Sequence, residues 1–240
     1  MNRLIKKLGD SHPDALSAMN DLANAYGHLG KHSEAEVLFK QCLDKQKVVL
    51  GESDPNSLPT MHGLANAYNH LGKHSEAQVL YKQVLDKMKV VLGESHPDTI
   101  SAMGNLASTY HRQCKYRDAE VLFKQCLDKT KIVLGENHPA TLMGMNNLAD
   151  TYDRQGKHKE AEVLRKQCLD KMKLVLGENH PTTLLAMKGL ADNYTRQEMY
   201  NDAEVLYKQV LDKQKVVLGD SHCDTLTTMH LYSLTEKLSG

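Results

Sequence analysis

The stretch LGESHPDTI, residues 92–100, decides how this chain folds, because related segments return at a fixed interval. They start at glycines 42 residues apart and read GDSHPDAL from Gly9, GESDPNSL from Gly51, GESHPDTI from Gly93, GENHPATL from Gly135, GENHPTTL from Gly177 and GDSHCDTL from Gly219. A constant period of this length predicts stacked repeats, each of which buries its apolar face against its neighbours. The segment holds Glu, His and Asp, but six copies along a stack favour a structural role over a catalytic one.

Composition narrows the classes of function. The chain has 240 residues with 30 basic and 30 acidic side chains, so it lacks the basic excess that nucleic-acid binding requires. The chain has no run of roughly 18 apolar residues, so no membrane span is predicted. The first residues, MNRLIKKLGDSHP, lack the apolar core of a signal peptide, so we expect a cytoplasmic protein.

The cysteines fit a reducing compartment. Cys42, Cys126 and Cys168 occupy one repeat position, where the other two repeats carry Val84 and Val210. A position that takes either Cys or Val is a small apolar packing site. Equivalent positions in stacked repeats are too far apart for a disulfide, so we expect reduced, structural cysteines.

Each 42-residue repeat contains two amphipathic patterns, which we name the A helix and the B helix. In the first repeat the A helix is expected over residues 12–28 and the B helix over residues 33–50. Their apolar residues recur at spacings of three and four: Leu16, Met19, Leu22, Ala23 and Tyr26, then Ala35, Leu38, Phe39, Cys42 and Leu43. No alternation typical of strands appears in the sequence.

Boundary signals flank these patterns. Ser11 and its equivalents Ser53, Ser95, Asn137, Asn179 and Ser221 are expected to cap the A helices, each followed by a residue in the first turn that is usually Pro. Ser33 with Glu36, and Ser75 with Gln78, predict capping boxes for two B helices. Gly30, Gly72 and Gly156 end A helices, whereas Cys114 and Glu198 stand at that position in two units.

We therefore expect one all-α array over residues 1–240. It comprises a partial helix at 1–8, repeats at about 9–50, 51–92, 93–134, 135–176 and 177–218, and a terminal capping helix at about 221–238.

The residues of each unit resemble those of the tetratricopeptide repeat family. Met19, Leu22, Ala23, Tyr26, Ala35 and Phe39 stand at its small and large positions, and the other units repeat them, except that Arg165 replaces the B-helix aromatic of the fourth unit. The 42-residue period, the LGESHPDT linker and the sequence from Asn146 to Ala149 resemble kinesin light chain and nephrocystin-like repeats. This resemblance implies an α-solenoid, a right-handed superhelix of stacked antiparallel helix pairs.

The resemblance also implies that the A helices line a concave groove that binds an extended peptide. The polar positions that fall in it are Asn20, Asn24, His28, His62, Asn66, His70, Asn105, His111, Arg112, Asn146, Asn147, Asp150, Arg154, Lys188, Asp192 and Arg196. Asparagine can bond both the N–H and the C=O of a peptide backbone, and arginine can hold a carboxylate with two parallel hydrogen bonds.

One row of these positions is basic or potentially basic in every unit: His28, His70, Arg112, Arg154 and Arg196, which we name the basic row. Asp150 and Asp192 lie four residues before Arg154 and Arg196 and can pair with them within the helix, whereas Ser108 precedes Arg112. Arg112 is therefore the first candidate for binding an acidic peptide, and a solvated helix edge is the alternative interpretation.

We predict a non-enzymatic adaptor that binds an extended, acidic segment of another protein. The alternative is a scaffold or oligomerisation module that self-associates through its terminal helices. The sequence shows no phosphate-binding loop and no nucleophile or zinc-protease motif, so we expect no enzymatic activity and no cofactor. Most of the 13 histidines come once per repeat, so we expect no metal site.

Overall fold

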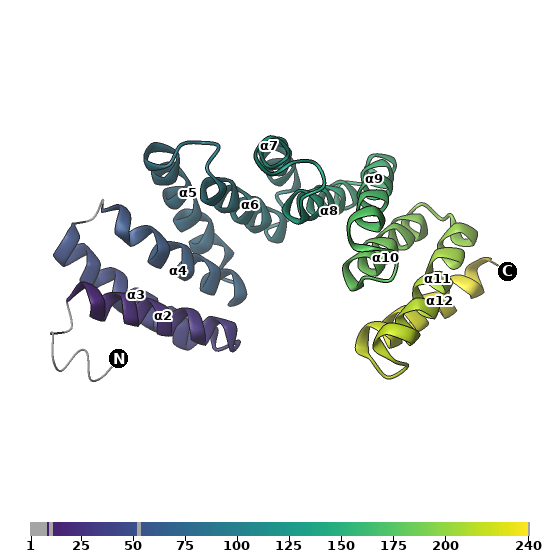
Figure 1. The fold of residues 1–240 in the computed structure, drawn as a ribbon, viewed down its shortest axis with the longest axis horizontal. Helices are drawn as coiled ribbons and strands as arrows, with labels where there is room; N and C mark the ends of the chain where they lie inside the picture. The colour runs from purple at the N-terminus through teal and green to yellow at the C-terminus, as the bar shows by residue number, and fades with distance from the viewer. Residues whose placement is uncertain (1–8, 10–11, 52–53, 240) are drawn as a thin grey trace. The chain divides into compact units, whose positions relative to one another are not determined.

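The structure is a computed structural model and describes residues 9, 12–51 and 54–239. Within these residues it contains eleven α-helices, one 3₁₀ helix and no β-strand (Figure 1). The helices are α2 (Pro13–His28), α3 (His32–Leu50), η1 (Pro55–Ser57), α4 (Leu58–His70), α5 (His74–Val91), α6 (Pro97–Arg112), α7 (Tyr116–Leu134), α8 (Pro139–Arg154), α9 (His158–Leu176), α10 (Pro181–Arg196), α11 (Tyr200–Leu218) and α12 (Cys223–Ser239). The helix predicted at 1–8 lies outside the described residues.

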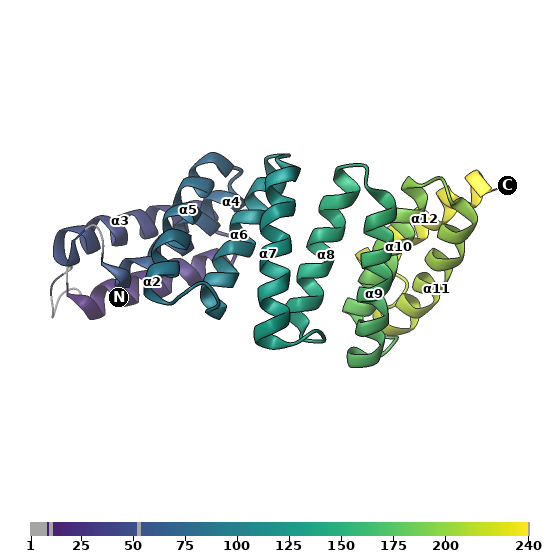
Figure 2. The ribbon, with the colours of Figure 1, turned by 90° about the horizontal axis from the view of Figure 1, so that it is seen from above.

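Helices that follow one another in the chain pack side by side. The chain divides into two compact parts, Met1–Leu122 and Phe123–Gly240, which we call the first unit and the second unit, and the boundary lies within α7. In the first unit α2 packs on α3, α3 on α4 and α4 on α5, and in the second unit α8 to α12 continue in the same way (Figure 2). The all-α architecture of stacked helix pairs is confirmed, whereas the continuity of one array and its handedness stay predictions.

The A helices begin differently from the prediction. His12, His96, His138 and His180 are the N-caps, and the Nδ1 atom of each accepts a hydrogen bond of 3.2 Å from the backbone amide two residues later. In the second repeat Asp54 does the same through Oδ1, at 2.7 Å from the Asn56 amide. The predicted Ser and Asn caps are wrong by one position among the described residues, and Ser11 and Ser53 lie outside them. Asp can replace His at this position because the side chain of either residue accepts a hydrogen bond from a backbone amide of the first turn.

The predicted capping boxes of the B helices are also wrong. Lys31 and Lys73 are the N-caps of α3 and α5, and neither makes a side-chain cap bond. Glu36, which is buried, instead accepts hydrogen bonds from Lys40 and from Lys73 of the next repeat. Burial alone would raise the pKa of Glu36, but the two lysines lower it below its usual value. This carboxylate therefore links two repeats and does not cap its own helix.

The turn between A and B helices requires a left-handed residue. Gly30, Gly72 and Gly156 have φ of 73°, 75° and 77°, and Cys114 and Glu198 adopt φ of 59° and 62° at the same place. A side chain is strained in this region, whereas glycine is not. We expect Glu198→Gly to raise the free energy of unfolding by roughly 0.5–1 kcal/mol in urea denaturation. The reverse change, Gly156→Glu, should lower it by a similar amount, and equal stability of both variants with wild type would contradict this account.

The buried cysteines serve packing, as predicted. Cys42 Sγ donates to the Leu16 carbonyl at 3.4 Å, and Cys168 Sγ donates to the Leu142 carbonyl at 3.3 Å. All five cysteines are free thiols. Burial raises the pKa of Cys168 to about 11, so this thiol stays protonated at neutral pH.

Candidate functional site

Four of the six predicted groove residues of the first two repeats line one open pocket of about 280 Å³ between α2, α3 and α4, whereas Asn20 and His62 do not. Asn24 and His28 line it from α2, and Asn66 and His70 line it from α4. Its lining also includes Phe39 and Gly63, and a Cβ built at Gly63 would lie 2.4 Å from Phe39 Cζ. The pocket thus combines amide and imidazole groups with an aromatic ring.

A stacked histidine pair lines this pocket and was not predicted. The imidazoles of His32 and His70 lie parallel, with ring centroids 4.2 Å apart and an interplanar angle of 6°. Burial lowers the pKa of His70, and the nearby His32 and Arg112 lower it further. His70 is therefore predominantly neutral at pH 7 and acts there as a hydrogen-bonding group more than as a cation.

A second group of predicted residues forms hydrogen bonds within the second repeat and from it to the third. With its Nε2 atom unprotonated, His62 accepts a hydrogen bond from Asn105 Nδ2 at 2.8 Å. Its Nδ1 atom lies 3.4 Å from Asn66 Nδ2. Tyr81 of α5 donates its hydroxyl to Asn66 Oδ1. These side chains fix α4, α5 and α6 relative to one another.

The state of His62 predicts a pH dependence. Burial lowers its pKa below 6.5, so the unfolded chain binds more protons than the folded chain as the pH falls towards and below that value. The free energy of unfolding should therefore have its full value at pH 7.5 and decrease as the pH is lowered towards 5. His62→Asn, which copies Asn20 and Asn146 of two other repeats, should weaken this decline in urea denaturation. Because the pKa of His70 is lowered too, part of the decline should persist; identical slopes for both proteins would contradict this role of His62.

In the second unit, a buried ion-pair cluster surrounds Asp153. Its side chain has no exposed surface, and Oδ2 lies 2.9 Å from Arg165 Nη2 and 3.6 Å from Arg196 Nη1. Oδ1 accepts from Asn193 Nδ2 at 2.6 Å and lies 3.2 Å from His158 Nδ1. The cluster therefore ties α8 to α9 and α10.

Sequence reasoning did not assign this cluster, although a signal was available. Arg165 stands where other B helices carry Phe39, Tyr81, Phe123 and Tyr207. Asp153 stands twelve residues earlier, at the position where other repeats carry Asn69, His111 and Thr195. In the fourth repeat an acidic and a basic residue each replace the uncharged residue that other repeats carry at that position. Two opposite charges introduced in the same repeat are expected to form an ion pair.

The B-helix position of Arg165 reaches the same A-helix position in three repeats. Tyr81 donates to Asn66, Tyr207 donates to Asp192 Oδ1 at 2.5 Å, and Arg165 Nη2 lies 3.7 Å from Asp150 Oδ1. Asn66, Asp150 and Asp192 therefore already serve the packing of A against B helices. Arg196 likewise has an ion pair in the fold, to Asp153.

The other predicted residues lie on the A helices with varied exposure. Exposed residues are Asn24, His28, His70, Arg112, Asn147, Arg154 and Arg196, and half-buried ones are Asn20, Asn105, His111, Asn146 and Lys188. His111 packs edge-on against Tyr116, with ring centroids 5.2 Å apart. Arg112 has no hydrogen-bond or ion-pair partner among the described residues, which leaves its guanidinium available to a ligand.

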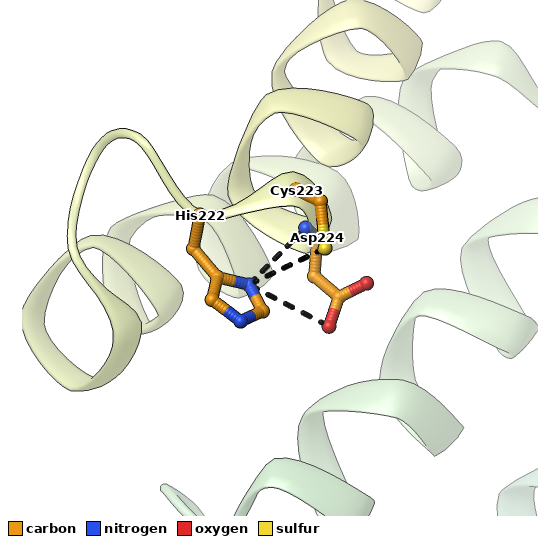
Figure 3. Close-up of side chains that lie close together, drawn as sticks. All are labelled: His222, Cys223 and Asp224. Carbon is orange, nitrogen blue, oxygen red and sulfur yellow. Dashed lines mark hydrogen bonds and ion pairs between the residues drawn. The ribbon is translucent and has the colours of Figure 1, made fainter. Parts of the chain in front are cut away.

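Within the described part of the chain, one group of side chains has the composition of a metal site: His222, Cys223 and Asp224 (Figure 3). His222 Nδ1, however, accepts from the Asp224 amide at 3.2 Å and lies 3.7 Å from Asp224 Oδ2. His96 and Asp98 make the same contacts around Pro97. Helix capping thus accounts for the positions of the histidine and the aspartate, and the lone pair of His222 Nδ1 is already engaged. The absence of a metal site stays a prediction.

The comparisons with known proteins agree with this architecture. The sequence matches the tetratricopeptide repeat family over residues 15–56, 56–132 and 154–215, so the chain belongs to that family. Among solved structures, it is similar to a kinesin light chain candidate of Podosopora anserina with nearly identical TPR-like repeats, at 28% identity and a TM-score of 0.76. That match covers 86% of this chain and 98% of the other, so the resemblance to kinesin light chain repeats extends over most of the chain.

More distant structures share the fold alone. BtubC (BKLC) from P. vanneervenii is 20% identical with a TM-score of 0.74, covering 91% of this chain and 87% of that one. The apo form of RapI is 14% identical with a TM-score of 0.71, covering 93% of this chain and 59% of that one. A search of curated proteins gave no match. None of the described helices combines the length and apolar character needed to cross a membrane.

Proposed function

We propose that this protein is a non-enzymatic adaptor that binds an extended, acidic segment of a partner protein along its A helices. The observation that carries the proposal is Arg112 of the basic row, which is exposed at the C-terminal end of α6. His28, His70, Arg154 and Arg196 are likewise exposed at the ends of their own A helices. A carboxylate near Arg112 would meet a guanidinium that has no ion-pair partner among the described residues.

The pocket of the first unit supports a peptide more than a small metabolite. It is open, and its polar groups are the side chains of Asn24, Asn66 and three histidines. Asn24 is exposed and can bond both the N–H and the C=O of an extended backbone. Repeat packing holds these groups in place before binding, so little entropy of the receptor is lost when a ligand binds.

Some of the predicted ligand-binding side chains already have partners within the fold, whereas others have none among the described residues. Asn66, Asp150, Asp192 and Arg196 have partners within the fold. Ligand contact at these positions would have to share or replace those bonds, which lowers their net contribution. Asn24, His28, Arg112 and Arg154 therefore stand first as ligand-binding residues.

The experiment that tests the proposed function is selection of peptides from a library that contains acidic, neutral and basic sequences in equal number. We expect acidic peptides to be enriched, and their affinity to fall as salt is raised because charge pairing is screened. Enrichment of neutral or basic peptides, or an affinity that salt leaves unchanged, would contradict the proposed ligand class.

A further inference from the structure

The outer face of each B helix carries a stripe of exposed aliphatic residues that packing within the fold does not explain. In the second unit the most exposed are Ile132, Leu174 and Val216, at 85%, 80% and 86% exposure, one near the end of each of α7, α9 and α11. Val163 and Val205 lie eleven residues earlier on α9 and α11 and are 57% and 56% exposed. In the first unit α3 and α5 carry Val48 and Val90 at 86% and 87%.

This stripe is the same in repeats whose groove positions differ. The residue four before the aliphatic one is Asp44, Asp86, Asp128, Asp170 or Asp212, and the residue just before it is Lys47, Lys89, Lys131, Lys173 or Lys215. By contrast, one A-helix position reads Asn20, His62, Gly104, Asn146 and Lys188. Duplication alone does not account for this contrast, because the same copies have diverged on the A helices.

The charges of the stripe indicate the kind of partner. Each aliphatic residue lies next to both an acidic and a basic side chain, as Leu174 does with Asp170 and Lys173. An anionic lipid surface or a nucleic acid would favour a basic excess, which a chain with 30 basic and 30 acidic residues lacks. A surface with alternating charges and a central aliphatic row is instead complementary to itself when a copy is turned by a two-fold rotation.

We propose that the outer face of the B helices is a self-association surface, on which a second copy of this chain packs its own B helices in antiparallel orientation. Aliphatic residues such as Leu174 then lie against those of the other copy, and each Asp of the stripe faces a Lys. A stripe about 16 Å long and about 10 Å wide on each of three helices covers on the order of 500 Å² per copy. Because this is less than the roughly 800 Å² per partner of a standard stable interface, the association is weak and depends on concentration.

Sedimentation velocity of the whole chain over a wide concentration range tests the proposal. We expect the mass of the wild type to rise from 26.9 kDa towards twice that value. The triple variant Ile132→Lys, Leu174→Lys, Val216→Lys should remain at the monomer mass, because buried lysines would repel one another across the interface. These side chains are at least 80% exposed, so the variant should keep the wild-type helix content and melting temperature.

The matched control places lysine on the A helices of the same unit. Met143→Lys with Leu185→Lys changes residues that are 61% and 65% exposed and lie off the stripe, and it should associate like the wild type. A second variant, Asp128→Lys with Asp170→Lys and Asp212→Lys, keeps the aliphatic row but removes the charge pairing, and it should also stay monomeric.

Three results would overturn the proposal. They are a wild type that stays at 26.9 kDa throughout, a triple variant that associates as the wild type does, or a control that loses association to the same extent. The second of these would place self-association at the terminal helices. Acidic peptides should bind the triple variant as they bind the wild type, so peptide binding and self-association can fail independently.

Discussion

Asp153→Asn is expected to lower the free energy of unfolding by about 3 kcal/mol, measured by urea denaturation at neutral pH. The substitution removes the negative charge that faces Arg165, whose guanidinium is buried with only 7% of the residue exposed. A buried charge without its partner costs about 3–5 kcal/mol. The lower end applies because Asp150 remains 3.7 Å from Arg165 Nη2.

A double variant provides the control for this prediction. Asp153→Asn with Arg165→Tyr gives the fourth repeat the pair that the second repeat has in Asn69 and Tyr81. The new tyrosine would donate to Asp150, as Tyr207 donates to Asp192. Because a buried ion pair can be replaced as a whole at little cost, the double variant should recover most of the lost stability. A double variant as unstable as the single one, or a single variant that loses less than about 1 kcal/mol, would contradict the compensating pair.

Gly63→Ala is expected to cost about 2 kcal/mol, although alanine is the better helix former. A Cβ at this position would lie 2.4 Å from Phe39 Cζ and 2.5 Å from Cε1. Phe39 is 2% exposed, so its ring has little room to move. The ring or α4 must shift, which is the overpacking penalty of a dense core.

Two other helical glycines separate this clash from helix propensity. Nothing lies within 4 Å of a Cβ at Gly27, and a Cβ at Gly144 would be 3.6 Å from Leu127 Cδ1, an ordinary contact. Gly27→Ala and Gly144→Ala should therefore raise the free energy of unfolding by roughly 0.5–1 kcal/mol, read from the same urea transitions. If all three substitutions stabilise alike, the close approach of Phe39 to α4 is not as described.

The period of the sequence was enough to predict the helices and their packing. Apolar spacing placed the A and B helices within a few residues of their bounds, and Gly30, Gly72 and Gly156 mark turns with positive φ. The helix caps were misplaced because Ser and His are adjacent in SHPD and the stronger statistical preference was for Ser. Only the structure shows that His96 Nδ1 reaches the amide of Asp98.

Contacts between repeats could not be predicted in the same way. The stack of His32 on His70 and the bond of Asn193 to Asp153 join residues 38 and 40 positions apart. Spacing shows which face of a helix a residue occupies, but not which rotamer it adopts or which neighbour it meets. Hence several predicted ligand-binding side chains, such as Asn66 and Asp192, have partners inside the fold.

The most direct measurement of the central claim is the affinity of one selected acidic peptide for the wild type, Arg112→Glu and Lys47→Glu, by fluorescence anisotropy. Arg112 lies on an A helix in the basic row, whereas Lys47 is an exposed lysine on the B helix α3, and both variants change the net charge equally. The account predicts a loss of roughly tenfold or more for Arg112→Glu, since a charge-assisted bond is replaced by repulsion. Lys47→Glu should bind nearly as the wild type does, and both variants should keep the wild-type melting temperature. Equal affinity of all three proteins would contradict peptide binding along the A helices.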